Sequence, residues 1–143
     1  MLQRLLLCTD LDRTLIPNGP QPESVGSRDR FAMLAGREEV TLAYVSGRDR
    51  TLVEAAISEY SLPLPDYVLG DVGTTIYHPD TDGSWQRQHD WDEEIASDWN
   101  GLDHAQLAQA LDHLKDLQIQ EAARQNLFKL SYYVSLQADR DGL

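Results

Sequence analysis

The chain has 143 residues, the size of one ordinary domain, with enough apolar residues to form a core. Its 24 aspartates and glutamates outnumber 12 lysines and arginines, and this gives a formal net charge of −12. Nucleic acids and anionic membranes need clustered basic residues, so the charge argues against both as partners. A single cysteine and the absence of a long apolar run predict a cytoplasmic protein without internal disulfides.

The first predicted element is a short apolar strand that ends in acidic residues. Residues 4–9 (RLLLCT) are followed by Asp10, Asp12 and Thr14. An apolar run of this kind is typical of a buried strand, and we expect Cys8 to be buried in it. In an open α/β sheet, ligands bind beyond the carboxyl ends of the strands. Two carboxylates held together there repel each other, which favours a divalent metal ion beside them.

A helix, a second strand and a second helix are predicted next. Residues 22–35 form a weak helical pattern, capped by Gly36, with three inward-facing candidates: Val25, Phe31 and Leu34. Residues 40–45 (VTLAYV) read as an apolar strand. From Asp49 onward, apolar residues recur on one face of a helix: Leu52, Val53, Ala56, Ile57 and Tyr60.

Ser46, Gly47 and Arg48 lie between this strand and this helix. A strand followed by Ser-Gly and a helix N-terminus brings a hydroxyl and free N–H groups to one place. Such an arrangement predicts a phosphate-binding loop.

A third strand is predicted over residues 66–69, and residues 71–77 combine a glycine turn with a further short strand. Strands that alternate with helices over short loops indicate a parallel α/β sheet. The Asp82-Gly83 pair, which lies between this last strand and Trp85, predicts a hairpin.

The pattern changes near residue 79, where we place the boundary between two domains, residues 1–79 and 80–143. Trp91, Ile95 and Trp99 recur with helical spacing on a short acidic helix. Asp103 is expected to cap a second helix, whose apolar positions are Leu107, Ala110, Leu111, Leu114 and Leu117. Residues 127–134 are predicted to form a strand.

Taken together, these motifs resemble the haloacid dehalogenase (HAD) superfamily of phosphohydrolases. The closer resemblance is to its sucrose-phosphate phosphatase-like members, through residues 5–14, 42–48, 67–78 and 126–133. The resemblance implies an α/β fold, namely the N-terminal part of a HAD-like Rossmannoid parallel sheet. An inserted α/β cap of the C2 type would follow it, so that the chain looks truncated.

The resemblance also implies a Mg²⁺-dependent phosphatase that works through an aspartyl-phosphate. Asp10 would be the nucleophile, and Asp12 would protonate the leaving sugar oxygen and then activate water. Mg²⁺ would be held by the carboxylate of Asp10 and, in the family's manner, by the backbone carbonyl of Asp12. The residues implied around the phosphate are Leu11, Thr14, Ser46 and Gly47.

Sucrose 6-phosphate is the substrate that the resemblance favours, with mannosyl- and glucosyl-glycerate phosphates and other hexose phosphates left open. Five residues are candidates for binding this substrate: Arg48, Thr74, Thr75, Lys129 and Tyr132. Four of them have a purely structural alternative, and for Arg48 it is a surface ion pair with Asp49 or Glu54. The threonines would otherwise be turn residues, and Lys129 an exposed strand residue.

The family also uses a later lysine, which steadies the phosphate, and a later acidic pair, which completes the metal shell. Neither is found here, so we expect the chain alone to have little or no activity. In the family the first strand is central. Its outer edge should therefore be open in this chain, to pair with a missing C-terminal half or a second copy.

Two alternative functions fit part of the pattern. One is a non-catalytic, sugar-phosphate-binding or regulatory module, such as a phosphatase-like appendage to a synthase. The other is a nucleotide-sugar glycosyltransferase, in which Asp10 and Asp12 would hold a metal-bound diphosphate. The second fits poorly, since it needs a nucleotide-binding region before the motif and only nine residues precede Asp10.

Overall fold

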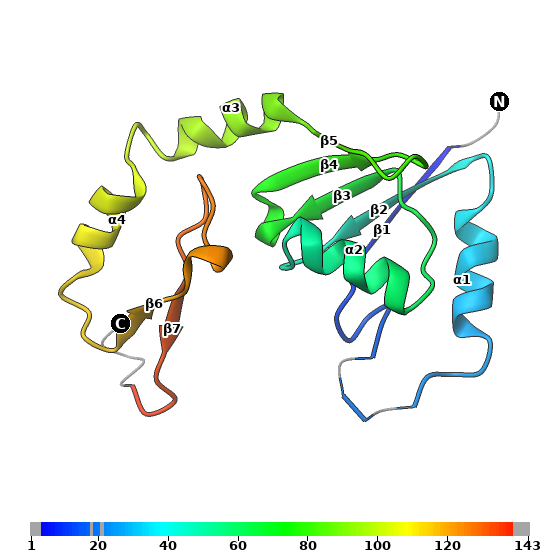
Figure 1. Cartoon of the computed structure of the whole chain (residues 1–143), viewed down its shortest axis with the longest axis horizontal. Helices are drawn as coiled ribbons and strands as arrows, with labels where there is room; N and C mark the ends of the chain where they lie inside the picture. The colour runs from blue at the N-terminus through cyan, green and yellow to red at the C-terminus, as the bar shows by residue number, and fades with distance from the viewer. Residues whose placement is uncertain (1–3, 18, 21, 139–143) are drawn as a thin grey trace. The chain divides into compact units, whose positions relative to one another are not determined.

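The computed structural model describes residues 4–17, 19–20 and 22–138. The chain divides into two structural units, Met1–Trp91 and Asp92–Leu143. The first unit holds a five-stranded sheet with the order β1-β2-β3-β4-β5, and the second unit holds the two-stranded sheet β6-β7 (Figure 1). The domain limits expected at residue 79 stay a prediction.

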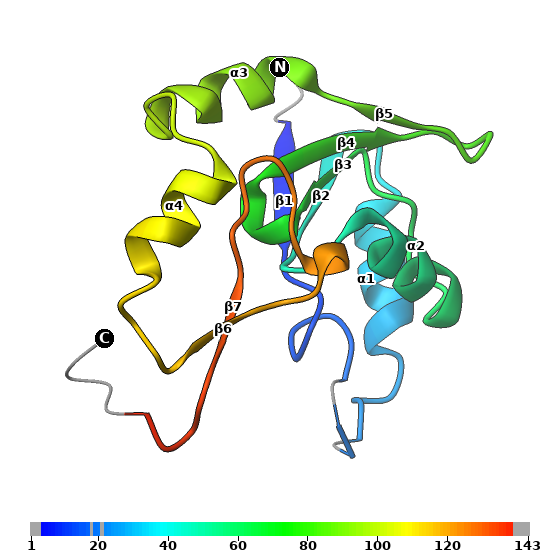
Figure 2. The ribbon, with the colours of Figure 1, turned by 60° about the vertical axis from the view of Figure 1, so that its left-hand side comes forward.

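Three parallel strands form the first part of the larger sheet. They are β1 (Leu5–Thr9), β2 (Val40–Val45) and β3 (Tyr67–Gly70), joined through the helices α1 (Ser27–Ala35) and α2 (Arg50–Glu59). Both crossovers move the chain in the same direction across the sheet, and right-handed connections then put both helices on one face. Figures 1 and 2 show α1 and α2 together on one side of the sheet.

The core lies between this face of the sheet and the two helices. Leu42 and Tyr44 of β2 pack in one cluster with Val53 and Ala56 of α2, and all four are 2% exposed or less. Phe31 of α1 packs against the cluster. The helical spacing predicted after Asp49 is thus confirmed.

Helix α1 begins later than predicted. It starts at Ser27, because Gly26 before it adopts φ 70°, a left-handed conformation that does not continue a helix. Val25 is therefore outside the helix and 96% exposed, so its predicted inward position is wrong. Gly36 ends the helix as predicted.

Strand β1 is not buried, and this corrects two predictions. Leu5 is 47% exposed, Leu6 is 62% exposed and Cys8 is exposed. The strand lies at the end of the sheet, where β2 is its one partner among the described residues. An apolar composition shows that a strand can be buried but not how many neighbours cover it.

The last two strands of this sheet, β4 (Thr75–Pro79) and β5 (Trp85–Arg87), run antiparallel to their neighbours. They form the predicted hairpin, and Gly83 adopts φ 85° in its turn. The one-turn helix η1 (Asp71–Gly73) links β3 to β4. This link is too short for a parallel crossover, so the predicted parallel sheet holds for β1, β2 and β3 alone.

The second unit is built around a small antiparallel hairpin. Helix α3 (His89–Asp98) leads into it, and its other elements are α4 (His104–Leu111), β6 (Leu117–Ile119), η2 (Ala122–Arg124) and β7 (Tyr132–Val134). The ring of Trp99 stacks on His104 at 5.5 Å between centroids and meets the edge of Phe128 at 5.7 Å.

Two predictions in this unit are corrected by the structure. Asp103 caps α4 as predicted, but the helix ends at Leu111, because Leu117 belongs to β6 and the chain must turn before it. The strand predicted over residues 127–134 is confirmed over Tyr132–Val134 alone. Before it, Asn126 and Lys129 exchange backbone hydrogen bonds of 3.2 Å, which close a tight turn.

None of the helices described is long and apolar enough to cross a membrane. Helices α2 and α3 have ten residues each, about half of a membrane span. The cytoplasmic location stays a prediction.

The exposure of β1 predicts that two leucines will respond differently to truncation. Leu42→Ala should lower the free energy of unfolding by about 2–5 kcal/mol, because Leu42 is buried. Leu6→Ala should change it by less than about 0.5 kcal/mol. Urea unfolding followed by circular dichroism measures both. Equal losses would show that β1 is buried on both faces.

Candidate active site

The site lies where the three parallel strands end. Thr9 is opposite Tyr44 in the β1–β2 register, and Val45 is opposite Leu69 in the β2–β3 register. The loops that follow the three strands are therefore neighbours at one edge of the sheet, which is where open α/β sheets bind ligands.

Leu11 anchors the first of these loops in the core. Its side chain is 0% exposed, and its carbonyl accepts hydrogen bonds from the N–H groups of Leu15 and Ile16 at 3.0 and 2.9 Å. Asp10 and Asp12 flank this anchor. The burial of one apolar residue thus holds both carboxylates at the sheet edge.

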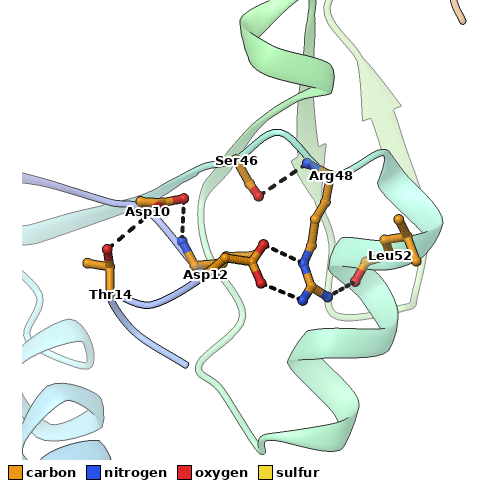
Figure 3. A network of polar contacts seen from close by, with 7 residues as sticks. Asp10, Asp12, Thr14, Ser46, Arg48 and Leu52 are labelled. Carbon is orange, nitrogen blue, oxygen red and sulfur yellow. Dashed lines mark hydrogen bonds and ion pairs between the residues drawn. The ribbon is translucent and has the colours of Figure 1, made fainter. Parts of the chain in front are cut away.

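The carboxylate of Asp10 is held by neutral donors. The N–H of Leu11 donates to Oδ1 at 2.8 Å, and the hydroxyl of Thr14 donates to Oδ2 at 3.4 Å (Figure 3). Asp10 forms no ion pair with a lysine or arginine in the described part of the chain. Its negative charge is therefore available to a cation. Thr14 contacts this carboxylate, and its place beside the phosphate stays a prediction.

Asp12 forms a bidentate ion pair with Arg48. The Nε and Nη2 groups of Arg48 donate to the two carboxylate oxygens at 2.9 and 2.7 Å, and Nη1 donates to the carbonyl of Leu52 at 3.3 Å (Figure 3). These hydrogen bonds hold the pKa of the Asp12 carboxyl below its usual range, although partial burial opposes the shift. The surface pairing considered for Arg48 is wrong, since Glu54 accepts from Arg50 instead.

The loop after β2 offers a buried hydroxyl and an open N–H. Ser46 is 4% exposed, its N–H donates to the carbonyl of Leu69 at 2.9 Å, and its Oγ accepts from the N–H of Arg48 at 3.2 Å. The N–H of Gly47 donates to no other described residue. This geometry suits the predicted phosphate loop, whose role stays a prediction.

A strained turn after β3 supports that loop. Asp71 and Val72 adopt φ 53° and 58°, in the left-handed region. This conformation costs about 1–2 kcal/mol for each residue with a Cβ. Their N–H groups donate to the carbonyls of Arg48 at 2.8 Å and Ser46 at 3.2 Å. This support could not be predicted from the sequence, because a turn that contains Gly73 does not reveal that Asp71 and Val72 are left-handed.

The two threonines predicted to bind substrate take part in the same turn. Thr74 donates to the carbonyl of Asp71 at 2.9 Å, and the 1%-exposed Thr75 donates to Oδ2 of Asp71 at 3.2 Å. Gly70 lets the loop after β2 come close to the end of β3, since a Cβ there would lie 3.1 Å from the carbonyl of Arg48. Both threonines therefore have structural partners, and their contact with a substrate stays a prediction.

Lys129 and Tyr132 belong to the second unit. Lys129 closes the turn before β7, and Tyr132 begins that strand, with its carbonyl accepting from the side chain of Gln120 at 3.2 Å. Contact of these two residues with a sugar stays a prediction.

The donors at this site suit a hard divalent cation. Among the residues described, no group of three or more histidine, cysteine or acidic side chains is arranged so that it could hold a metal ion. Mg²⁺ needs fewer, because it commonly binds through one or two protein oxygens together with water and phosphate. The carboxylate of Asp10 fits this role. Both side-chain oxygens of Asp12 are bonded to Arg48, which makes its backbone carbonyl the better donor.

The sequence matches the family "Sucrose-6F-phosphate phosphohydrolase" over residues 3–141. A "Putative HAD-like hydrolase" of Nitrosococcus oceani is 50% identical over all 143 residues, which make up 38% of that protein. A "Glucosylglycerol-phosphate synthase" of Pseudomonas anguilliseptica is 35% identical over 80 residues, or 54% of this chain and 10% of that protein.

Among solved structures, the sucrose-phosphatase of Synechocystis sp. PCC6803, determined with sucrose and phosphate, is similar with a TM-score of 0.74 and 28% identity. The match covers 95% of this chain and 51% of that one. The chain therefore spans about half, or less, of the length of the relatives that it matches.

The ion pair at the site should be measurable as a coupling free energy. A double-mutant cycle of Arg48→Gln and Asp12→Asn should give about 1 kcal/mol at neutral pH, the upper part of the range for partly exposed pairs. The control cycle uses Arg37 and Glu39, a more exposed pair at 3.9 Å, and should give nearly zero. Urea unfolding measures both, and equal couplings would contradict the structure.

The strained turn predicts that a substitution to glycine will stabilise the protein. Val72→Gly should raise the free energy of unfolding by up to about 1 kcal/mol, because relief of the left-handed strain exceeds the entropy that glycine adds to the unfolded chain. Val45→Gly, in regular strand geometry, should lower it instead. A loss at both positions in thermal unfolding would argue against strain at Val72.

Proposed function

Because the chain belongs to the sucrose-6F-phosphate phosphohydrolase family of HAD-like hydrolases, we propose that it provides the nucleophile half of a sugar-phosphate phosphatase site. The observation that carries the proposal is the carboxylate of Asp10, which lies at the end of a parallel strand without a cationic partner among the described residues. Ser46 and Gly47, whose geometry suits a phosphate loop, lie at the end of the adjacent strand.

Asp10 would act as the nucleophile. An oxygen of its carboxylate attacks phosphorus, a new P–O bond forms, and the bond from phosphorus to the sugar oxygen breaks. Thr14 and the N–H of Leu11 hold the carboxylate in place for this attack. Water then attacks phosphorus in the aspartyl-phosphate, which releases inorganic phosphate and restores Asp10.

Asp12 would move the protons in both steps. It gives a proton to the leaving sugar oxygen and takes one from the attacking water. Arg48 fixes the position of the carboxylate through two hydrogen bonds and favours its ionised form. The ionised form is the one that takes a proton from water in the second step, whereas the first step requires an Asp12 that carries a proton. With three of its nitrogens engaged, Arg48 acts first on Asp12, and its contact with the substrate remains a proposal.

Phosphate oxygens would be bound by the Ser46 hydroxyl and the Gly47 N–H, with the N–H of Leu11 shared between Asp10 and the phosphate. Mg²⁺ would be held by the Asp10 carboxylate and the Asp12 carbonyl, and when bound it would neutralise charge on the phosphate. The same positive charge reduces the repulsion between the phosphate dianion and Asp10.

Sucrose 6-phosphate is the substrate we favour, and family membership supports it. The relative from Synechocystis was determined with sucrose and phosphate, which agrees with this choice. Thr74, Thr75, Lys129 and Tyr132 are the further candidates for contact with the sugar.

A second candidate function is a non-catalytic, sugar-phosphate-binding module. The similarity to a glucosylglycerol-phosphate synthase favours this module. The match covers only 10% of that protein, so a segment similar to this chain occurs there within a much larger protein that is named as a synthase. In this case the site would bind phosphate through Ser46 and Gly47 without forming a covalent bond to Asp10.

A substitution of Asp10 distinguishes the two functions. Mg²⁺ with beryllium fluoride, which mimics a phosphoryl group on aspartate, should give a bound ¹⁹F signal with the wild-type chain. Asp10→Asn should abolish this signal, because the amide does not form the Be–O bond. Asp116→Asn, at an exposed turn residue, is the matched control and should retain it.

Turnover is measured in parallel as phosphate release from sucrose 6-phosphate. A beryllium fluoride signal that depends on Asp10 but comes without turnover would indicate an incomplete enzyme, whereas a signal independent of Asp10 would support the binding module. A signal that survives in Asp10→Asn would show that Asp10 is not the nucleophile.

A further inference from the structure

Trp91 makes a contact that its helical spacing does not predict. It is the third residue of α3 and shares an apolar stripe of that helix with Trp99. The ring of Trp99 packs in the second unit, against His104 and Phe128. The indole N–H of Trp91 instead donates to the carbonyl of Gly73 at 2.9 Å, within the first unit. The stripe is therefore divided, and Trp91 bonds the turn after β3.

The β4–β5 hairpin brings α3 to this turn. Strand β5 runs antiparallel to β4, and Arg87 at its end is opposite Tyr77. The N–H of Gln88 then donates to the carbonyl of Ile76 at 2.9 Å, one residue nearer to the start of β4. Helix α3 begins at the next residue. Its first turn therefore lies beside η1, the short helix that immediately precedes β4.

The turn at η1 has a conformation that must be held by its surroundings. Asp71, Val72 and Gly73 adopt φ 53°, 58° and 89°, three successive left-handed positions. Two of these residues carry a Cβ, and such strain persists only where neighbouring contacts determine it. Two threonine hydroxyls bond Asp71, at the start of the turn. Trp91 bonds the carbonyl of Gly73, so the turn is held at both of its ends.

The turn in its place carries the loop after β2. Its first two N–H groups donate to the carbonyls of Arg48 at 2.8 Å and Ser46 at 3.2 Å. Arg48 then binds both carboxylate oxygens of Asp12 (Figure 3). A continuous series of hydrogen bonds thus leads from the indole of Trp91, through the left-handed turn, to the loop that carries Ser46 and Arg48.

We propose that Trp91 is a positioning residue of the candidate site. Its indole N–H fixes the left-handed turn at residues 71–73, and the turn fixes the loop that carries Ser46 and Arg48. Trp91 acts through this turn and not by contact with a substrate. The hold on the turn follows from the geometry alone, whereas its consequence for phosphate binding and for Asp12 rests on the proposed function.

Amide hydrogen exchange measures the hold on the turn. In Trp91→Phe, which removes the indole N–H, exchange at Asp71 and Val72 should be faster by about 5- to 10-fold, the effect of one lost hydrogen bond. Exchange at Val53, a fully buried residue of α2, reports on opening of the whole unit and should change little. Trp99→Phe is the matched control on the same helix and should leave exchange at the turn unchanged.

The side chain of Arg48 gives a readout that a purely structural role of Trp91 would not change. Its Nε–H signal in ¹⁵N NMR, identified by its absence in Arg48→Gln, should shift in Trp91→Phe, because the ion pair with Asp12 loses its fixed geometry. Trp91→3-benzothienylalanine keeps the shape of tryptophan with sulfur in place of the N–H. It should give the same shift and the same faster exchange without leaving a cavity.

The link to the site is measured by titration with Mg²⁺ and beryllium fluoride. The bound ¹⁹F signal should require a concentration about 5- to 10-fold higher in Trp91→Phe, because the loop of Ser46 is no longer held in one position. Trp99→Phe should bind as the wild-type chain does.

Faster exchange confined to the turn, together with the shifted Arg48 signal, supports the proposal. Unchanged exchange at the turn overturns it, and so does equal acceleration at Val53, which would make Trp91 a residue of general stability. A loosened turn with an unchanged affinity for beryllium fluoride overturns the role of Trp91 in the site. Absence of beryllium fluoride binding by the wild-type chain would count against the proposed function alone, because the exchange and Arg48 readouts require no ligand.

Discussion

The ion pair between Arg48 and Asp12 joins the loops after β1 and β2, and the geometry of the candidate site depends on it. Arg48 is itself fixed at three points: at the Asp12 carboxylate, at the carbonyl of Leu52 and, through its own carbonyl, at the N–H of Asp71. The proposed acid/base residue is thus positioned through all three parallel strands. A substitution at the end of β3 can therefore alter the position of Asp12 without contacting it.

Much of this arrangement could be predicted, because the information is local in the sequence. The apolar run of β2, the helical spacing of α2 and the cap at Asp103 are each set by residues within a few positions of one another. The loops that carry Asp10 and Ser46 follow from the same reasoning. Parallel strands end at one edge of a sheet, so residues just after them meet there.

The remaining features depend on contacts between distant residues. Arg48 and Asp12 are 36 positions apart, and Asp49 and Glu54 were equally reasonable partners for the arginine by sequence alone. The exposure of Cys8 depends on how many strands flank β1, which its own composition does not show. Val72 is exposed and adopts a left-handed conformation that valine disfavours. Contacts with the Ser46 loop, and not local preference, therefore hold this turn in place.

The exposed position of β1 at the end of the sheet also has a consequence during synthesis of the chain. Synthesis runs from the N-terminus, so β1 exists before any of the strands that pair with it. Its β2 side is covered within the next few dozen residues, whereas its outer side has no partner strand among the residues described. An apolar edge strand in this state can pair with the same strand of another nascent chain. The net charge of −12 opposes such pairing, because identical chains of this charge repel each other.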